Sequence, residues 1–308
     1  MKVVFLGTGL LGLPTLRALA NSPEHEVCAV FTQPDRPAGR GLELRASPVK
    51  VLAQELRLRI CQPEVINREV DAIGRVQPDV VVVAAYGQIL SGELLRIPRL
   101  GSINLHAALL PRYRGAAPIQ WALIHDEGTT GLTTFLMDEG LDTGPILLQR
   151  SLPIVEEDTA ASLEARLAEL GAGLMLDTLR GLERGELAPC PQDNAKASYA
   201  PKIKKELGKI DWTKSARELF NLIRALNPTP GAYAFYQGKR LKIHRSRITH
   251  DKELPRRPGD VIGFGQAGVI VETGQGALEI TEVQPEGKKS MTGMDFARGV
   301  HMEVGVQL

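Results

Sequence analysis

The chain has 308 residues, of which 43% are hydrophobic and 24% are charged. This is the composition of a globular protein, and the length suits two domains, because a single core usually stops growing near this size. No apolar run approaches the roughly 20 residues of a membrane-spanning helix, and a strand pattern starting at Lys2 leaves no room for a signal peptide. We therefore expect a cytoplasmic protein. The cysteines, Cys28, Cys61 and Cys190, are widely spaced, which argues against a disulfide framework and against a zinc site.

The charges are distributed unevenly along the chain. Residues 1–195 carry 18 Lys and Arg against 24 Asp and Glu, whereas residues 196–308 carry 19 against 12. A basic C-terminal part is typical of a surface that meets a polyanion. A lysine-rich domain without such a partner fits the charges equally well.

The first part of the chain alternates short apolar segments with amphipathic ones. Strands are expected at 2–6, 26–31, 57–61, 79–85, 102–105, 132–137 and 146–150. Helices are expected at 10–20, 47–55, 119–125 and 159–184. Apolar strands separated by helices predict a doubly wound, Rossmann-like α/β domain, which we assign to residues 1–188.

The pattern changes after this domain. Residues 189–207 are polar and punctuated by prolines, which predicts a linker. A helix is expected next, followed by short strands between glycine-rich turns, at 213–226, 240–248, 261–262, 269–271 and 278–280. This spacing predicts a small β-barrel or sandwich over residues 208–308, and a barrel of the oligonucleotide-binding (OB) type suits the basic charge.

The first turn matches a nucleotide-binding pattern. Gly7-Thr8-Gly9-Leu10-Leu11-Gly12 follows a strand and opens a helix, as in dinucleotide-binding folds. That pattern also needs an acidic residue at the end of the second strand, and Asp35 comes too late. Because a tight turn needs glycine without any cofactor, an NAD(P)-dependent oxidoreductase remains only an alternative.

The densest group of chemically useful side chains follows the strand at 102–105. Asn104 and His106 are two residues apart, so their side chains point to the same side of the strand, at the edge where ligands bind. Asp142 lies in a glycine-containing turn after another strand and can reach the same edge. A histidine moves protons near neutral pH, a carboxylate orients it, and an amide donates to an oxyanion.

Two reaction types compete for such residues. No G-x-S-x-G serine and no candidate nucleophilic cysteine is present, so direct acyl transfer to an amine fits better than a covalent acyl-enzyme. Purely structural roles for Asn104, His106 and Asp142 fit the spacing equally well.

At these residues the chain resembles the folate-dependent formyltransferase family. The resemblance rests on Asn104-x-His106, on Leu-Leu-Pro-x-x-Arg-Gly-x-x-Pro from Leu109 to Pro118, and on Leu-Asp-Thr-Gly around Asp142. It implies that Asn104, His106 and Asp142 are catalytic and that 10-formyltetrahydrofolate is the formyl donor. No cluster of metal ligands appears in the sequence, so no metal is expected to take part. The residues that it places at the folate site are Tyr86, Gly87, Gln88, Ile89, Leu90, Leu110, Pro111, Asp138 and Gly140.

The acceptor is implied by other segments. Residues 32–41 are similar to a loop of the tRNA-specific members, although Leu42-Glu43 stands where the family commonly has two lysines. The resemblance implies formyl transfer to initiator methionyl-tRNA by a monomer. The residues expected to bind tRNA are Arg36, Arg40, Lys202, Lys204, Lys205 and Lys209. A formyltransferase for an amino sugar or a ribotide, and a non-catalytic RNA-binding protein, remain alternatives.

Overall fold

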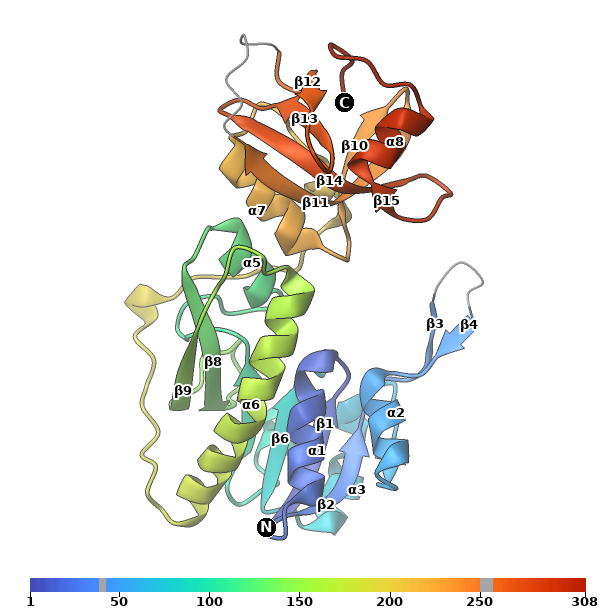
Figure 1. The fold of residues 1–308 in the computed structure, drawn as a ribbon. Coiled ribbons are helices and arrows are strands. Elements are labelled where there is room, and N and C mark those ends of the chain that lie inside the picture. Colours follow the sequence, from blue (N-terminus) through green and yellow to red (C-terminus); the bar gives the residue numbers. More distant parts are fainter. Residues whose placement is uncertain (39–42, 250–256) are drawn as a thin grey trace. The chain divides into compact units, whose positions relative to one another are not determined.

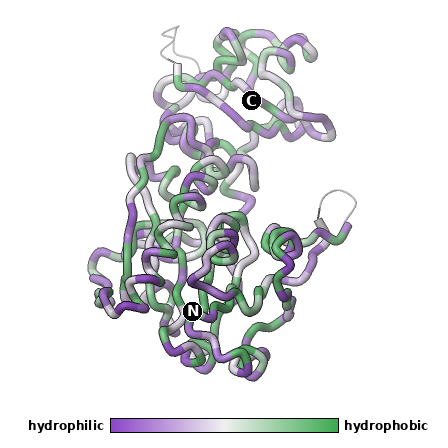
Figure 2. Tube along the Cα trace, turned by 60° about the horizontal axis from the view of Figure 1, so that its bottom comes forward, coloured by the Kyte–Doolittle hydropathy of each residue, from purple (hydrophilic) through white to green (hydrophobic). Residues whose placement is uncertain are grey.

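A computed structural model describes residues 1–38, 43–249 and 257–308 of the chain. The chain forms two compact units (Figure 1). Unit 1 consists of Met1–Pro118, Thr129–Pro153 and Leu163–Pro201, and unit 2 of Ile119–Gly128, Ile154–Ser162 and Lys202–Leu308. Figure 2 shows hydrophobic and hydrophilic stretches alternating along the chain of both units.

A seven-stranded sheet forms the centre of unit 1. Its strands are β1 (Lys2–Gly7), β2 (Glu26–Phe31), β5 (Ile60–Cys61), β6 (Val80–Ala84), β7 (Ser102–His106), β8 (Thr129–Leu136) and β9 (Ile146–Pro153), in the order β5-β2-β1-β6-β7-β8-β9. The pairs from β5 to β7 are parallel, whereas β8 and β9 are antiparallel additions. Every residue of β6 is buried, as expected of a parallel strand covered on both faces. The α/β prediction is confirmed.

The predicted helices of the N-terminal part are present and begin close to the predicted positions. They are α1 (Leu13–Asn21), α2 (Pro48–Glu55), α5 (Pro118–Ile124) and α6 (Ala160–Glu183). The helices α3 (Val70–Val76) and α4 (Gly92–Leu95) were not predicted, because they are too short to show a helical period. Ser47 caps α2 by accepting a hydrogen bond from the Lys50 amide, 3.0 Å away, and Pro48 takes the first helical position. A Cβ atom at Gly171 of α6 would lie 2.7 Å from Leu105, so α6 packs closely against β7.

A small hairpin projects from the segment that the sequence predicts to be a loop (Figure 1). Its strands, β3 (Arg36–Ala38) and β4 (Glu43–Arg45), pair only with each other, and all of β4 is exposed. The prolines and glycines of this segment are typical of loops, and the alternation from Leu42 to Arg45 is too short to indicate a strand, so sequence reasoning missed both strands.

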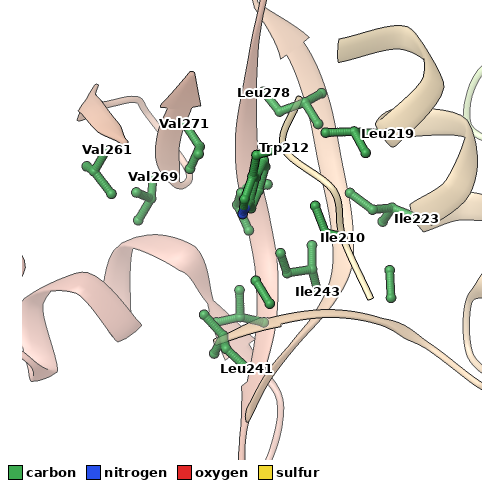
Figure 3. Close-up of a cluster of buried hydrophobic side chains, with 14 of the residues drawn as sticks. Ile210, Trp212, Leu219, Ile223, Leu241, Ile243, Val261, Val269, Val271 and Leu278 are labelled. Carbon is green, nitrogen blue, oxygen red and sulfur yellow. The ribbon is translucent and has the colours of Figure 1, made fainter. Parts of the chain in front are cut away.

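Unit 2 is built on a six-stranded antiparallel sheet. Its strands are β10 (Ala232–Tyr236), β11 (Lys239–Thr249), β12 (Val261–Phe264), β13 (Val269–Glu272), β14 (Ala277–Pro285) and β15 (Met291–Thr292), with α7 (Ala216–Leu226) and α8 (Gly293–Gly299). Trp212 lies at the centre of the core, among side chains of α7 and the strands (Figure 3). The predicted C-terminal β domain is confirmed, and its strands form an antiparallel sheet. Strand β10 escaped prediction because its buried positions include the small residues Ala232 and Ala234, while Tyr233 and Phe235 point outward.

Candidate active site

Strand β7 carries two of the predicted catalytic residues on one face. Leu105 packs against Gly171 of α6, so by the alternation of a strand Asn104 and His106 point to the opposite face. His106 is only 6% exposed, whereas Asn104 is half-buried. Within the described part of the chain, the Asn104 amide has no hydrogen-bond partner, which leaves its donors available to a ligand.

The imidazole of His106 is held from both sides. Its Nε2 atom lies 2.9 Å from the carbonyl oxygen of Tyr113. Because a carbonyl oxygen can only accept, Nε2 carries a proton, and Nδ1 is the nitrogen that gains or loses one. Nδ1 faces the Oδ2 atom of Asp142 at 3.7 Å, too far for a hydrogen bond but close enough for the carboxylate to stabilise an imidazolium. The orientation of the ring thus depends first on Tyr113.

A single backbone turn connects the histidine and the carboxylate. The Gly115 amide donates a hydrogen bond of 2.8 Å to Oδ2 of Asp142, two residues after the Tyr113 carbonyl accepts from His106. Tyr113 and Gly115 both have positive φ angles, of 61° and 119°. A Cβ atom at Gly115 would lie 2.8 Å from the carbonyl oxygen of Ala200, so only glycine fits there.

Asp142 reaches His106 through a loop that reverses direction. Strand β8 runs antiparallel to β7, so Leu136 at its end pairs with Ile103 near the start of β7. The loop between β8 and β9 therefore runs back along β7. A Cβ atom at Gly144 would overlap the carbonyl oxygen of Leu136, so this return also requires glycine.

The same loop is stabilised from within. The Oδ1 atom of Asp138 accepts hydrogen bonds from the Gly140 amide at 3.0 Å and from the Thr143 hydroxyl at 2.7 Å. Asp138 and Gly140, both predicted at the folate site, are exposed. In this structure Asp138 orders the loop that carries Asp142.

Residues 190–200, which lie in the predicted linker, are hydrogen-bonded to this site. The Ser198 hydroxyl accepts from the Tyr113 amide at 2.9 Å, and the Ser198 carbonyl accepts from the Arg114 amide at 2.8 Å. The guanidinium of Arg114, a residue only 2% exposed, donates to Gln192 and Asn194. Sequence reasoning missed all of these contacts, because nothing in the sequence pairs residues that lie 78 to 85 positions apart. The linker boundaries at 189 and 207 stay a prediction.

Comparisons with known proteins identify the family. A formyl transferase model matches residues 1–179, and a model of the formyl transferase C-terminal domain matches residues 202–301. The chain belongs to the formyl transferase family. It is 45% identical over 307 residues to a methionyl-tRNA formyltransferase of Citrifermentans bemidjiense, covering 99% of this chain and 95% of that protein.

Solved structures share the fold of this formyltransferase. An N-formyltransferase from Helicobacter canadensis in complex with folinic acid and dTDP-3-aminofucose has a TM-score of 0.68 at 19% identity, covering 92% of this chain and 99% of that one. HypX from Aquifex aeolicus in complex with tetrahydrofolic acid has a TM-score of 0.66 at 19% identity, covering 99% of this chain. The present chain covers only about half of HypX, 48% of the length of that protein.

The segment predicted to line the folate site of the formyltransferase begins at a buried tyrosine. Tyr86 is 2% exposed, and its hydroxyl has no hydrogen-bond partner among the described residues. Burial, with a smaller contribution from Glu69, raises the pKa of Tyr86 to about 12. Gly87 has a φ of 85°, and the Gln88 side chain bonds to backbone atoms of Glu64 and Ile66.

Two further residues of this segment have opposite environments. Ile89 is 85% exposed, which is unusual for a large apolar side chain, whereas Leu90 is 3% exposed. Leu90 and Tyr86 share a hydrophobic cluster with Met137, the residue before the loop that carries Asp142. Two of the predicted folate-binding segments therefore lie side by side.

Leu110 and Pro111, also predicted at the folate site, are attached to the other side of β7. The Leu110 amide donates to the Thr133 hydroxyl at 3.0 Å, and its carbonyl accepts from Gln149 at 2.9 Å. Thr133 pairs with His106 across β7 and β8. These two residues are thus near the histidine, and no contact in the described residues joins them to Tyr86.

Those predicted tRNA-binding residues that the structure describes are on the surface. Arg36, in β3, forms an exposed ion pair of 2.9 Å with Glu64, and Arg40 lies outside the described residues. At the base of the hairpin, Asp35 accepts from Lys50 at 2.6 Å and from Gln62 at 2.8 Å, and these bonds hold the Asp35 pKa below its usual value. The remaining tRNA candidates are exposed in unit 2: Lys202, Lys204, Lys205 and Lys209.

The first turn of the formyltransferase needs its glycines for packing. The amides of Thr8 and Gly9 both donate to the carbonyl of Ala85. A Cβ atom at Gly12 would lie 3.0 Å from Phe5 and 3.1 Å from Ala84. Contact with β6 accounts for the glycine pattern without a nucleotide.

Three further observations concern the rest of the described chain. A cavity of about 530 Å³ in unit 2 is lined by residues of α7, β11 and 156–159, none of which was predicted to be functional. Across residues 1–38, 43–249 and 257–308, no cluster of three His, Cys, Asp or Glu side chains is arranged to hold a metal ion. No helix in those residues is long and apolar enough to cross a membrane.

Proposed function

We propose that this chain transfers the formyl group of 10-formyltetrahydrofolate to the α-amine of initiator methionyl-tRNA, giving N-formylmethionyl-tRNA for translation initiation. The observation that carries the proposal is the buried His106, whose Nδ1 faces Asp142 on the same face of β7 as the unpaired Asn104 amide. The 45% identity to a methionyl-tRNA formyltransferase over nearly the whole chain supports the acceptor.

In the proposed mechanism the neutral amine attacks the formyl carbon directly. As the new C–N bond forms, the carbonyl electrons move to oxygen, and the Asn104 amide donates to that oxyanion. Nδ1 of His106 takes the amine proton, and Asp142 stabilises the imidazolium. When the bond between the formyl carbon and N10 of the folate breaks, the proton passes from His106 to N10. Tyr113 keeps Nε2 protonated throughout, so only Nδ1 takes part.

The donor pocket is proposed to lie between the segment 86–90 and the loop that carries Asp142. The shared cluster of Tyr86, Leu90 and Met137 brings these segments together. The exposed Ile89 supplies an apolar contact for an aromatic ring. HypX, which shares the fold, has been solved in complex with tetrahydrofolic acid, which supports a folate donor.

For the acceptor, the proposal assigns phosphate contacts to exposed basic residues. Arg36 on the hairpin, and Lys202, Lys204, Lys205 and Lys209 in unit 2, position the tRNA without reading its sequence. An amino sugar is the second candidate acceptor, because the Helicobacter canadensis enzyme with the same fold was solved with dTDP-3-aminofucose. That enzyme is 19% identical to this chain, whereas the methionyl-tRNA formyltransferase of Citrifermentans bemidjiense is 45% identical, which favours the tRNA as acceptor. We further propose that the protein acts as a cytoplasmic monomer.

The acceptor is tested with 10-formyltetrahydrofolate carrying a labelled formyl group. Wild-type protein is offered charged initiator methionyl-tRNA, the same tRNA without methionine, and a dTDP-linked amino sugar. The proposal expects label only in the charged tRNA. Label in the amino sugar with none in the charged tRNA would overturn the assignment of the acceptor.

A further inference from the structure

Gln192 joins the two loops that carry the histidine and the carboxylate. Its Oε1 atom accepts hydrogen bonds from Nε and Nη2 of Arg114, at 3.1 and 2.7 Å. Its Nε2 atom donates to the backbone carbonyls of Asp142 at 2.9 Å and Gly144 at 2.7 Å. One half-buried side chain thus makes four hydrogen bonds to segments that lie 48 to 78 residues away.

The orientation of the Gln192 amide is fixed by its partners. The guanidinium of Arg114 can only donate, and the two backbone carbonyls can only accept. A flipped amide would place its NH₂ group against the guanidinium and its oxygen against two carbonyl oxygens. The side chain therefore has a single favourable arrangement, and it holds both loops only in that arrangement.

The two ends of the Gln192 amide, Oε1 and Nε2, form two arms, and each arm reaches one of the groups that hold His106. On one side, Arg114 lies directly between Tyr113, whose carbonyl holds Nε2 of His106, and Gly115, whose amide holds the Asp142 carboxylate. On the other side, Gln192 bonds the backbone of Asp142 itself, a residue with a φ of 53° that requires outside support. The separation of 3.7 Å between Nδ1 of His106 and Oδ2 of Asp142 therefore depends on both sets of Gln192 hydrogen bonds.

We propose that Gln192 is a positioning residue for formyl transfer, which acts by fixing Asp142 and the 113–115 turn around His106. This inference rests on the proposed function. Gln192 touches no reacting atom, so it affects the rate only through the geometry of the pair. A displacement of about 1 Å at reacting groups can lower a rate about a hundredfold, and the loss of this bridge is expected to have an effect of that order.

The first test is Gln192→Met, which keeps the size of the side chain and removes all four hydrogen bonds. We expect kcat to fall about tenfold to a hundredfold, with the KM for the folate donor within about twofold of wild type. The matched control is Gln284→Met in unit 2, because Gln284 also bridges a loop, by donating to the Lys288 carbonyl at 2.9 Å. The control should keep its kcat. A wild-type kcat in folded Gln192→Met would overturn the proposal.

A second variant covers the case in which Gln192→Met does not fold. Gln192→Glu still accepts from Arg114 but turns an oxygen toward the carbonyls of Asp142 and Gly144, so it breaks only that arm. The proposal expects kcat to fall about tenfold to a hundredfold. An unchanged kcat in Gln192→Glu would count against the proposal in the same way.

Two readouts distinguish the proposed positioning role of Gln192 from a purely structural role. In an Asp142→Asn background, Gln192→Met should lower kcat less than about threefold further, because both changes disturb the same pair of His106 and Asp142, whereas a structural role would multiply the two losses.

Nitrogen NMR of His106 needs no substrate: wild type should show the Nε2–H tautomer alone, and Gln192→Met a mixture. A single tautomer in both proteins would overturn the proposal. Wild type that transfers no formyl group to methionyl-tRNA would instead defeat the proposed function, and the NMR comparison would still decide the role of Gln192.

Discussion

The catalytic face of β7 and the β3–β4 hairpin belong to the same unit but are built in opposite ways. His106 is 6% exposed, and the groups around it are held by hydrogen bonds from three separate segments. The hairpin is exposed along β4 and is held mainly at its base, by Asp35. The difference follows from the proposed tasks, because chemistry needs its groups positioned before the substrate arrives, whereas phosphate contacts need only charge within reach.

The largest effect is expected from His106→Ala. Removal of the group that moves the proton should lower kcat about 100-fold to 10,000-fold, measured by transfer of labelled formyl to charged initiator tRNA. Folding is checked by circular dichroism. A loss below about fivefold in a folded variant would remove His106 from the mechanism.

Asp142→Asn comes next in size. The amide keeps an oxygen that can accept from Gly115 but no longer stabilises an imidazolium at Nδ1. We expect kcat to fall about tenfold to a hundredfold, with the KM for the folate donor unchanged. A kcat equal to that of wild type in the folded variant would show that Asp142 does not assist the histidine.

A smaller effect, on a different parameter, is expected at the hairpin base. Lys50→Met removes the ion pair of 2.6 Å that holds Asp35, so the KM for tRNA should rise about threefold to tenfold while the folate KM stays unchanged. Arg99→Met is the control, because Arg99 forms a similar pair of 2.7 Å with Asp79 away from the hairpin. Equal effects in both variants would show that the hairpin has no special part in binding tRNA.

The smallest effect concerns Tyr86. Because its hydroxyl is buried without a partner in the described residues, Tyr86→Phe should raise the free energy of unfolding by about 1 kcal/mol at pH 8. Since the folded pKa is about 12 and the unfolded one is about 10, the hydroxyl ionises first in the unfolded chain. Wild type should therefore lose stability as pH rises from 10 toward 12, whereas Tyr86→Phe should not, and the difference between them should widen. Denaturant unfolding of wild type and Tyr86→Phe at pH 8 and pH 10.5 measures the difference in stability and its change with pH. A variant less stable than wild type at pH 8 would mean that the hydroxyl has a partner.

The same contrast explains what the sequence could predict. Strands such as β6 are apolar throughout, so their positions follow from composition, and the common face of Asn104 and His106 follows from strand alternation. Asp142 was expected at the same edge because of its glycine-containing turn, but the antiparallel direction of β8, which makes the loop run back along β7, could not be foreseen.

Backbone and long-range contacts were beyond sequence reasoning. Tyr113 acts on His106 through its carbonyl, which every residue type carries, so no residue identity signals that role. Gln192 lies in a polar, proline-rich stretch that resembles any linker, and its partners are 48 to 78 positions away. The predicted tRNA contacts stay predictions, because their geometry depends on the tRNA.

The most direct test compares His106→Ala and Lys50→Met in one steady-state assay with charged initiator tRNA as the varied substrate. If the catalytic face supplies the chemistry and the hairpin supplies affinity, His106→Ala lowers kcat with the KM for tRNA unchanged, and Lys50→Met raises that KM with kcat unchanged. A loss of kcat in Lys50→Met, or an increase in the tRNA KM as the main effect of His106→Ala, would contradict this division of roles.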